Sequence, residues 1–288
     1  MGTWGPGLYS NDIAKDLKST ITAVARLPLN TDELIDIIVG SFPEAATDAD
    51  DEDHTTFWLV LADQFHRKGI AHRDLFDRAV GIIESGKDLN TPSVAEMGVG
   101  DQRKREKALN KLRRQLTEPV PSKTRKTLSK PQPLILEVGD VVTFPIVDTG
   151  GCFNPYLIKA SWTRADWGAA AIVRSGLAFG YLAHYRPVVI NRRLKSSAQP
   201  TLQTLLAHAG WRLARPGTCS KPHFRRMQLE VIGKVAINTE RLTSVFPDIR
   251  DGTYSAVNDI SIANSFYVYN EPRDHDTNID SLSILNAL

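Results

Sequence analysis

Hydrophobic residues recur every three to four positions through the first part of the chain, which predicts amphipathic helices. Five helices are expected, at 10–28, 30–43, 53–69, 73–85 and 101–116. The last has a narrow apolar seam among many basic residues, so most of its surface is expected to face solvent. The pattern therefore predicts a helical N-terminal domain.

Beyond residue 133 the pattern changes to short β-branched and aromatic runs separated by turns, which predicts strands. Strands are expected at 134–138, 141–147, 155–162, 178–185, 187–190, 228–236 and 265–269, with one helix at 202–209. The intervening segment holds four prolines and several bases, which is typical of a linker. The expected fold class is α+β, with an acidic helical domain at 1–116, a basic linker at 117–133, and a β-rich domain at 134–288. The second domain is expected to be an SH3-like barrel or an α+β structure.

Charge is unevenly distributed along the chain. Residues 1–100 carry 17 acidic and 8 basic side chains, whereas residues 101–130 carry 11 basic and 3 acidic ones. The formal net charge of +2 conceals this difference. A strongly acidic surface accelerates association with basic partners, so the first half is a candidate protein-binding region.

Several features bear on the cellular compartment. The N-terminal residues lack the charged and apolar regions of a secretory signal, and no run approaches the roughly 18 apolar residues of a membrane span. We therefore expect a cytoplasmic protein with no membrane partner. Two cysteines, Cys152 and Cys219, fit neither a disulfide framework nor a zinc site, and are interpreted as semi-buried thiols.

Two parts of the sequence hold residue types that bind metals, the acidic run at 48–54 and three histidines. The acidic run at 48–54 lacks the glycine and the glutamate of an EF-hand loop, so it is interpreted as a solvated helix-capping run. Three histidines, His54, His66 and His72, could meet with Asp63 or Asp74, but their spacing matches no recognised metal motif. Exposed polar histidines are the preferred interpretation, and no metal is predicted.

Catalytic motifs are absent from the sequence. There is no nucleophile elbow, no activated-cysteine signature, no phosphate-binding loop and no dinucleotide fingerprint. We therefore predict no catalytic residues and no cofactor.

Basic residues cluster in the helix at 101–116 and again near residue 225. They have the charge density to contact phosphates, with salt-dependent binding. A solvated helix, or docking of these bases on the acidic half, are the alternatives. The candidate nucleic-acid residues are Arg103, Lys104, Arg105, Arg113, Arg114, His223, Arg225 and Arg226.

The opening MGTWGPGLYSNDIAKD resembles uncharacterised bacterial families that begin with a WGxG segment and an Asn-Asp helix cap. The resemblance continues through FWLVLADQFHRKG, AVGIIESGKDL, RKREKALNKLRRQL and EVGDVVTF. Some members of these families are suspected immunity proteins encoded near bacterial toxins, so the resemblance implies a role in binding another protein. It brings no catalytic residues with it.

The segment 138–158 is similar to the first hairpin of small SH3-like-barrel toxins that cut messenger RNA. Where those toxins carry a basic residue followed by Arg-Pro, this chain has Phe153, Asn154 and Pro155.

Two functions from different classes follow. The preferred hypothesis is a non-enzymatic, immunity-like or antitoxin-like protein that binds a protein partner, which is expected to be basic. The alternative is a nucleic-acid-binding or RNA-cleaving module that uses the basic linker and the C-terminal domain, and a purely structural role is the third option. The candidate protein-binding residues are Trp4, Tyr9, Asp16, Asp48, Asp50, Asp51 and Asp53.

Overall fold

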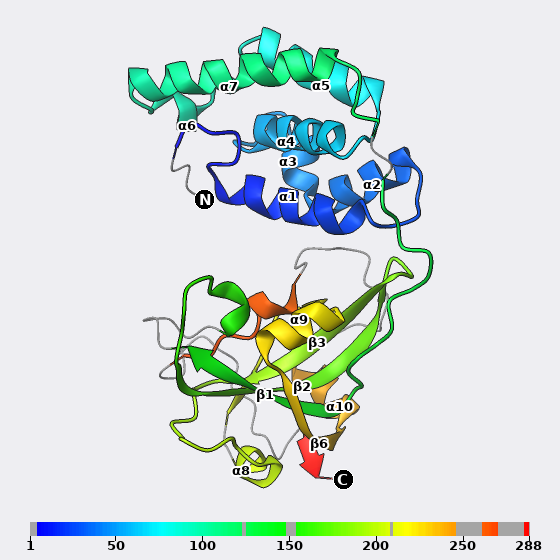
Figure 1. The fold of residues 1–288 in the computed structure, drawn as a ribbon, viewed down its shortest axis with the longest axis vertical. Helices are drawn as coiled ribbons and strands as arrows, with labels where there is room; N and C mark the ends of the chain where they lie inside the picture. The colour runs from blue at the N-terminus through cyan, green and yellow to red at the C-terminus, as the bar shows by residue number, and fades with distance from the viewer. Residues whose placement is uncertain are drawn as a thin grey trace. The chain divides into compact units, whose positions relative to one another are not determined.

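The computed structural model describes residues 5–122, 125–147, 154–207, 210–245, 261–269 and 285–287. The chain divides into two compact units, Met1–Ser129 and Lys130–Leu288. Helices build the first unit and an antiparallel sheet builds the second (Figure 1). This arrangement confirms the predicted α+β class with an N-terminal helical region.

The helical unit is organised around one central helix. Its elements are α1 (Asp12–Val24), α2 (Thr31–Ser41), α3 (Pro43–Thr47), α4 (His54–Arg67), α5 (Arg73–Glu84), η1 (Asp88–Asn90), α6 (Pro92–Ala95) and α7 (Val99–Thr117). Helix α4 is buried along residues 54–66 and contacts α1, α3, α5 and α7. Figure 1 shows it between α1 on one side and α5 and α7 on the other. This unit is therefore a layered helical bundle with α4 at its core.

Polar caps begin two of these helices where the sequence indicates them. The Asn11 side chain accepts a hydrogen bond from the Ala14 amide at 2.8 Å, which caps α1. Asn30 and Glu33 form a reciprocal capping box at the start of α2. Pro43 was expected to end a helix, but it is the first residue of α3. Proline suits that position because its missing N–H has no helical partner there.

The second unit contains a sheet of seven described strands in the order β4-β3-β2-β1-β6-β7, with β5 also paired to β3. All of these pairings are antiparallel. The strands are β1 (Asp140–Val147), β2 (Arg164–Ala178), β3 (Leu182–Ile190), β4 (Trp211–Leu213), β5 (Gly217–Thr218), β6 (Glu230–Ile237) and β7 (Leu285–Ala287). The helices are η2 (Pro155–Leu157), α8 (Leu202–Leu206), α9 (Lys221–Met227), α10 (Thr239–Val245) and η3 (Ile262–Asn264).

Three of the predicted strands are wrong, and one long strand was missed. Residues 155–162 contain η2, and neither 134–138 nor 265–269 forms a strand. Strand β2 was not predicted because it is rich in alanine and glycine, which have low strand propensity. Its backbone pairs with β1 on one side and with β3 on the other, and these two ladders stabilise it as a strand despite its low strand propensity.

The segment 134–138 packs on the sheet through side chains. The Ile135 amide donates a hydrogen bond to the Tyr185 hydroxyl at 2.8 Å, and Leu136 is buried in the core. These contacts explain why a strongly apolar run is present without a strand ladder.

Strand β3 runs without a break through Pro187, although two strands were predicted there. Pro187 lies opposite Ile172, where the β2–β3 register shifts between Ile172 and Arg174. A proline is tolerated at such an irregularity because one ladder hydrogen bond is already lost.

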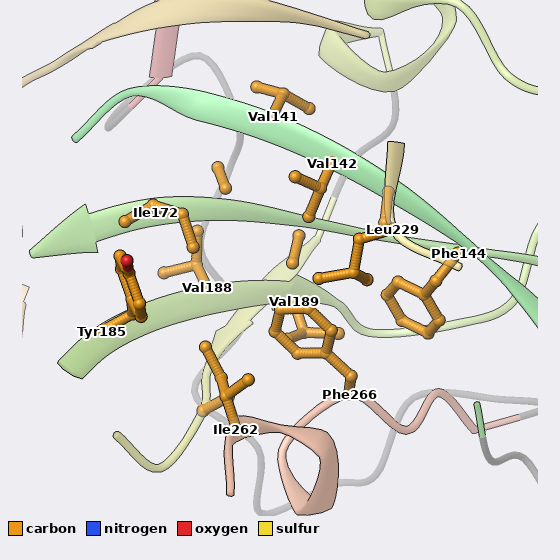
Figure 2. Packing of buried hydrophobic residues seen from close by; sticks show 14 of the residues in the cluster. Val141, Val142, Phe144, Ile172, Tyr185, Val188, Val189, Leu229, Ile262 and Phe266 are labelled. Carbon is orange, nitrogen blue, oxygen red and sulfur yellow. The ribbon is translucent and has the colours of Figure 1, made fainter. Parts of the chain in front are cut away.

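The apolar core of the sheet unit joins β1, β2 and β3 to residues near the C-terminus (Figure 2). The Phe144 and Phe266 rings are stacked with centroids 5.1 Å apart. Gly168 lies opposite Phe144 in the ladder, and a Cβ at this glycine would fall 2.4 Å from the phenyl ring. The stacked pair therefore depends on glycine at this position.

Candidate functional site

The acidic residues of the helical unit are concentrated in one stretch of the chain. Residues 27–66, which we call the acidic segment, contain no lysine or arginine and form α2, α3, a turn and almost all of α4. Two carboxylates of this segment form ion pairs: Asp32 Oδ1 lies 3.0 Å from His72 Nε2, and the buried Asp63 pairs with Arg67. The exposed carboxylates are Asp32, Glu33, Asp36, Glu44, Asp48, Asp50 and Glu52.

The turn before α4 carries the predicted acidic binding residues. The Asp48 carboxylate accepts from the Asp50 amide at 2.9 Å, and the Asp51 carboxylate accepts from the Asp53 amide at 2.8 Å. Asp53 occupies the N-cap of α4 but makes no side-chain capping hydrogen bond, so the predicted capping role is wrong for its carboxylate. Burial raises the pKa of Asp53, and repulsion from Glu52 and Asp51 raises it further.

The Tyr9 hydroxyl makes hydrogen bonds inside the helical unit. Its hydroxyl donates to Asp63 and accepts from Gln64 Nε2 at 2.5 Å. Burial and the neighbouring Asp63 carboxylate raise the pKa of Tyr9, so its phenol stays protonated. Of the other predicted binding residues, Asp16 is exposed on α1, and Trp4 lies outside the described residues.

The Asp63 carboxylate is a buried junction between three segments. It accepts from Arg67 Nε at 2.7 and 2.8 Å, from Gln115 Nε2 at 3.0 Å, and from the Tyr9 hydroxyl. Each carboxylate oxygen therefore has partners, and Asp63 is a structural group that holds α4, α7 and the N-terminal segment together.

The histidines do not form the ligand set that was considered. His54 and His66 are each only 6 % exposed, so the expectation of exposed histidines is wrong for both. His54 Nδ1 lies 2.9 Å from the Ala45 carbonyl oxygen, and the His66 ring packs on Phe76. His72 caps α5 through the Leu75 amide. No group of three potential metal ligands occurs within the described ranges.

Arg105 is the one predicted phosphate-binding residue of α7 that the structure removes from solvent. Its guanidinium forms a double contact with the Asp88 carboxylate, with Nη2 2.6 Å from Oδ1, and donates to the Gly7 carbonyl at 3.0 Å. Both Arg105 and Asp88 are almost completely buried. The prediction that Arg105 contacts nucleic acid is therefore wrong, because its charge is used inside the helical unit.

The other bases of α7 remain at the surface. Lys104 pairs with Asp101 at 2.9 Å and Arg113 lies 3.6 Å from Glu84. Four other exposed cations of α7, which we call the α7 row, are spaced by four, four and three residues. Their side chains therefore share one face of the helix. The α7 row has no acidic partner among the described residues, and consists of Arg103, Lys107, Lys111 and Arg114.

A pocket that no sequence motif indicated lies in the helical unit. We call it the basic pocket; its volume is about 420 Å³. It is lined where the end of α1, the end of α4 and the segment after α7 come together. The lining residues are Thr22, Ala25, Arg26, Gln64, Arg67, Lys68, Arg125 and Lys126. Sequence analysis missed it because its five cations come from three separated segments.

The basic candidates of the sheet unit lie on α9. The edge of the His223 ring meets Tyr156 with centroids 5.0 Å apart, and the Arg226 guanidinium stands 4.8 Å over the same Tyr156 ring. Arg225 is exposed. This arrangement is aromatic packing with cationic side chains at its edge.

A second pocket, of about 380 Å³, lies beside β1, β2 and β6. The Arg164 guanidinium covers the Trp167 ring at 4.8 Å. Indole rings and guanidinium groups stack on nucleobases, so this pocket bears on the nucleic-acid alternative. It is lined by Pro145, Trp162, Arg164, Trp167, Gln228, Leu229 and Glu230.

The hairpin that resembled an RNA-cleaving toxin is not formed. Asn154 is buried and its Nδ2 donates to the Ala263 and Phe266 carbonyl oxygens at 2.7 and 2.9 Å. Pro155 then begins η2 rather than a second strand. Phe153 lies outside the described residues. Of the three positions compared with the toxin motif, the structure therefore describes Asn154 and Pro155, and both have structural roles.

Two titratable groups buried in the sheet unit, Cys219 and His184, are held neutral. Burial raises the pKa of the Cys219 thiol to about 12, and burial together with Arg186 lowers the pKa of His184 to about 4. Neither group is set up as a nucleophile or a base at neutral pH. Cys152 lies outside the described residues.

Comparisons of this chain with protein-family models, with curated proteins and with solved structures found no match. Among the helices that the structure describes, none has the length and apolar character needed to cross a membrane.

Proposed function

We propose that this chain is a non-catalytic binding protein of immunity or antitoxin type, and that its helical unit binds a basic protein partner. The observation that carries the proposal is the acidic segment. These forty consecutive residues contain no lysine or arginine, and they place seven exposed carboxylates on a folded unit. Such a surface attracts cationic partners and raises their association rate.

The chemistry of the described side chains supports binding over catalysis. His54 and His66 are packed into the helical unit, His184 and Cys219 into the sheet unit, and Tyr9 is hydrogen-bonded to Asp63. The residue runs that resemble suspected bacterial immunity proteins support the same proposal. Acidic immunity-type proteins use electrostatic steering to reach basic targets such as nucleases.

The proposal is tested by affinity purification of the tagged protein from its native host at low and moderate salt. A triple variant, Asp48→Asn, Asp50→Asn and Glu52→Gln, removes three exposed charges but keeps the side-chain acceptor that bonds the Asp50 amide. The matched control is Glu96→Gln, Glu106→Gln and Glu118→Gln, which removes three exposed charges outside the acidic segment.

We expect one basic protein to be recovered at low salt, lost as salt rises, and recovered less well by the triple variant than by the control. The mass spectrum of the eluate identifies it. Recovery of no protein at low salt, or equal recovery by both variants, contradicts the proposal.

The α7 row favours a second candidate function, which is binding of a nucleic-acid backbone. Replacing its four cations by glutamine should weaken a low-salt mobility shift of RNA or DNA and flatten its salt dependence. A chain that shifts neither nucleic acid at low salt excludes this candidate.

A further inference from the structure

We propose that the basic pocket binds a small, multiply phosphorylated anion. Five cationic side chains line this one cavity of the helical unit, and the lining contains no carboxylate. The inference rests on the cavity and its donors, and it is independent of the protein partner proposed above.

The cations are not needed to complete the two helix ends beside them. At the end of α1, the Ile21, Ala23 and Val24 carbonyls accept from backbone amides of residues 25–27. At the end of α4, the carbonyls of residues 64–66 accept from backbone amides of residues 68–70. Cations are generally favourable near helix C-termini, but here the backbone satisfies the terminal carbonyls by itself.

Arg125 has a structural task at the pocket. Its Nη2 donates to the Leu29 carbonyl at 2.5 Å and to the Leu27 carbonyl at 3.3 Å. These bonds fix the segment after α7 against the turn that follows α1. A positive side chain is thereby held at the pocket wall before any ligand is present.

Three of the five cations, Arg26, Arg125 and Lys126, have no acidic partner among the described residues. Arg67 pairs with Asp63, whose other contacts are Tyr9 and Gln115. Lys68 Nζ lies 3.4 Å from Thr22 Oγ1. Arg26 and Lys126 are exposed and have no acidic partner in the described part of the chain. The positive charge of Arg26, Arg125 and Lys126 therefore remains for a ligand.

The lining groups indicate the chemistry of that ligand. Guanidinium and ammonium groups are the main phosphate donors of proteins, and the Thr22 hydroxyl adds a further donor. The volume of about 420 Å³ lies within the range of small-molecule sites, about 300–1,000 Å³. The lining holds no aromatic ring, so a nucleobase would find no stacking surface there. The phosphates would provide most of the recognition.

A small anion fits this geometry better than a nucleic-acid strand. A strand presents one charge per roughly 3.4 Å along its axis, which suits a linear row of cations such as the α7 row. Five cations from three segments around one cavity suit several charges gathered on one small molecule.

The test is isothermal titration of the full chain with inorganic tripolyphosphate at low salt. The pocket variant is Arg26→Gln with Lys126→Gln, because both side chains are exposed and lack acidic partners. The control variant is Arg103→Gln with Lys107→Gln, which removes the same charge from the exposed face of α7. Thermal unfolding of each variant without ligand checks that both remain folded.

We expect saturable binding of tripolyphosphate, about tenfold or more weaker for the pocket variant and nearly unchanged for the control, since a charge-assisted hydrogen bond contributes at least a factor of ten. Arg26→Lys should retain most of the affinity. Equal weakening in both variants indicates unspecific attraction and overturns the proposal. If the chain does not bind tripolyphosphate, the proposal is wrong. It is also wrong if the pocket variant binds tripolyphosphate as well as the unchanged chain does and loses only its binding of oligonucleotides.

Discussion

The helical unit and the centre of the sheet unit differ in how they use charge. The helical unit buries the Asp88–Arg105 pair and the Asp63 carboxylate and uses them to join segments that are far apart in sequence. The sheet unit builds its centre from apolar side chains and strand ladders, and its buried His184 is held neutral. The N-terminal segment is therefore held by ionic contacts, whereas the centre of the sheet is held by packing and backbone pairing.

Removing one member of the Asp88–Arg105 pair should give the largest effect. Asp88→Asn leaves Arg105 buried without a counter-charge, which typically costs about 3–5 kcal/mol. Asp101→Asn, which breaks the exposed pair with Lys104, should change the free energy of unfolding by about 0.5 kcal/mol or less. Urea unfolding followed by circular dichroism measures both. Similar losses in the two variants would show that burial of the first pair does not matter.

The packing of the sheet unit is tested by Gly168→Ala. Its new methyl group would fall 2.4 Å from the Phe144 ring and 3.0 Å from Val268, so the stacked rings must move. Overpacking of this severity should cost about 3 kcal/mol, measured as a lower urea midpoint. An unchanged midpoint would mean that the core adapts without cost.

The buried His184 of the sheet unit should make the stability of the protein depend on pH. Its pKa in the folded chain is about 4, below the ordinary value of 6.5, so the unfolded chain binds the proton first as pH falls. Stability should therefore be independent of this group above pH 6.5 and decrease as pH falls toward 4. Between pH 7.5 and pH 5 the loss should be about 2 kcal/mol.

The matched measurement is urea unfolding of His184→Gln at the same two pH values. The pKa of His54 is also lowered by burial, so it contributes in the same direction in both proteins. The difference between the proteins isolates His184. A variant that retains the full pH dependence would contradict the assignment.

The smallest expected effect is a gain in stability in the helical unit. Gly81 lies inside α5, and a Cβ there would meet nothing within 4 Å. Gly81→Ala should stabilise the protein by about 0.5–1 kcal/mol because alanine loses less backbone entropy in a helix. A small rise in the urea midpoint, opposite in sign to that of Gly168→Ala, would confirm the contrast.

The helices of this chain could be predicted well because their signals are local. The Asn11 and Asn30 caps and the repeat of apolar residues lie within a few positions of one another. Strand β2 could not be predicted in this way, because its alanine-rich sequence becomes a strand only between β1 and β3. The strand predicted at 134–138 failed for the converse reason, since Leu136 is buried without joining a ladder.

The candidate sites show the same difference between features that depend on local sequence and features that depend on contacts between distant segments. The acidic charge of the first half and the basic charge of α7 can be counted from the sequence, and these counts led to both functional hypotheses. The burial of Arg105 could not be predicted from the sequence, because Asp88 and Gly7 approach it only in the folded unit. Sequence analysis therefore predicted the charge of α7 but not which of its cations face solvent.

By itself, the sequence determined the α+β class, the helix caps and the uneven distribution of charge, because each depends on residue types or on neighbours a few positions apart. The tertiary structure alone decided that Tyr9 and Arg105 serve the interior, and that Arg26, Lys68 and Lys126 meet at one pocket. Contacts between distant segments depend on how the helices pack, and that information is spread over the whole unit.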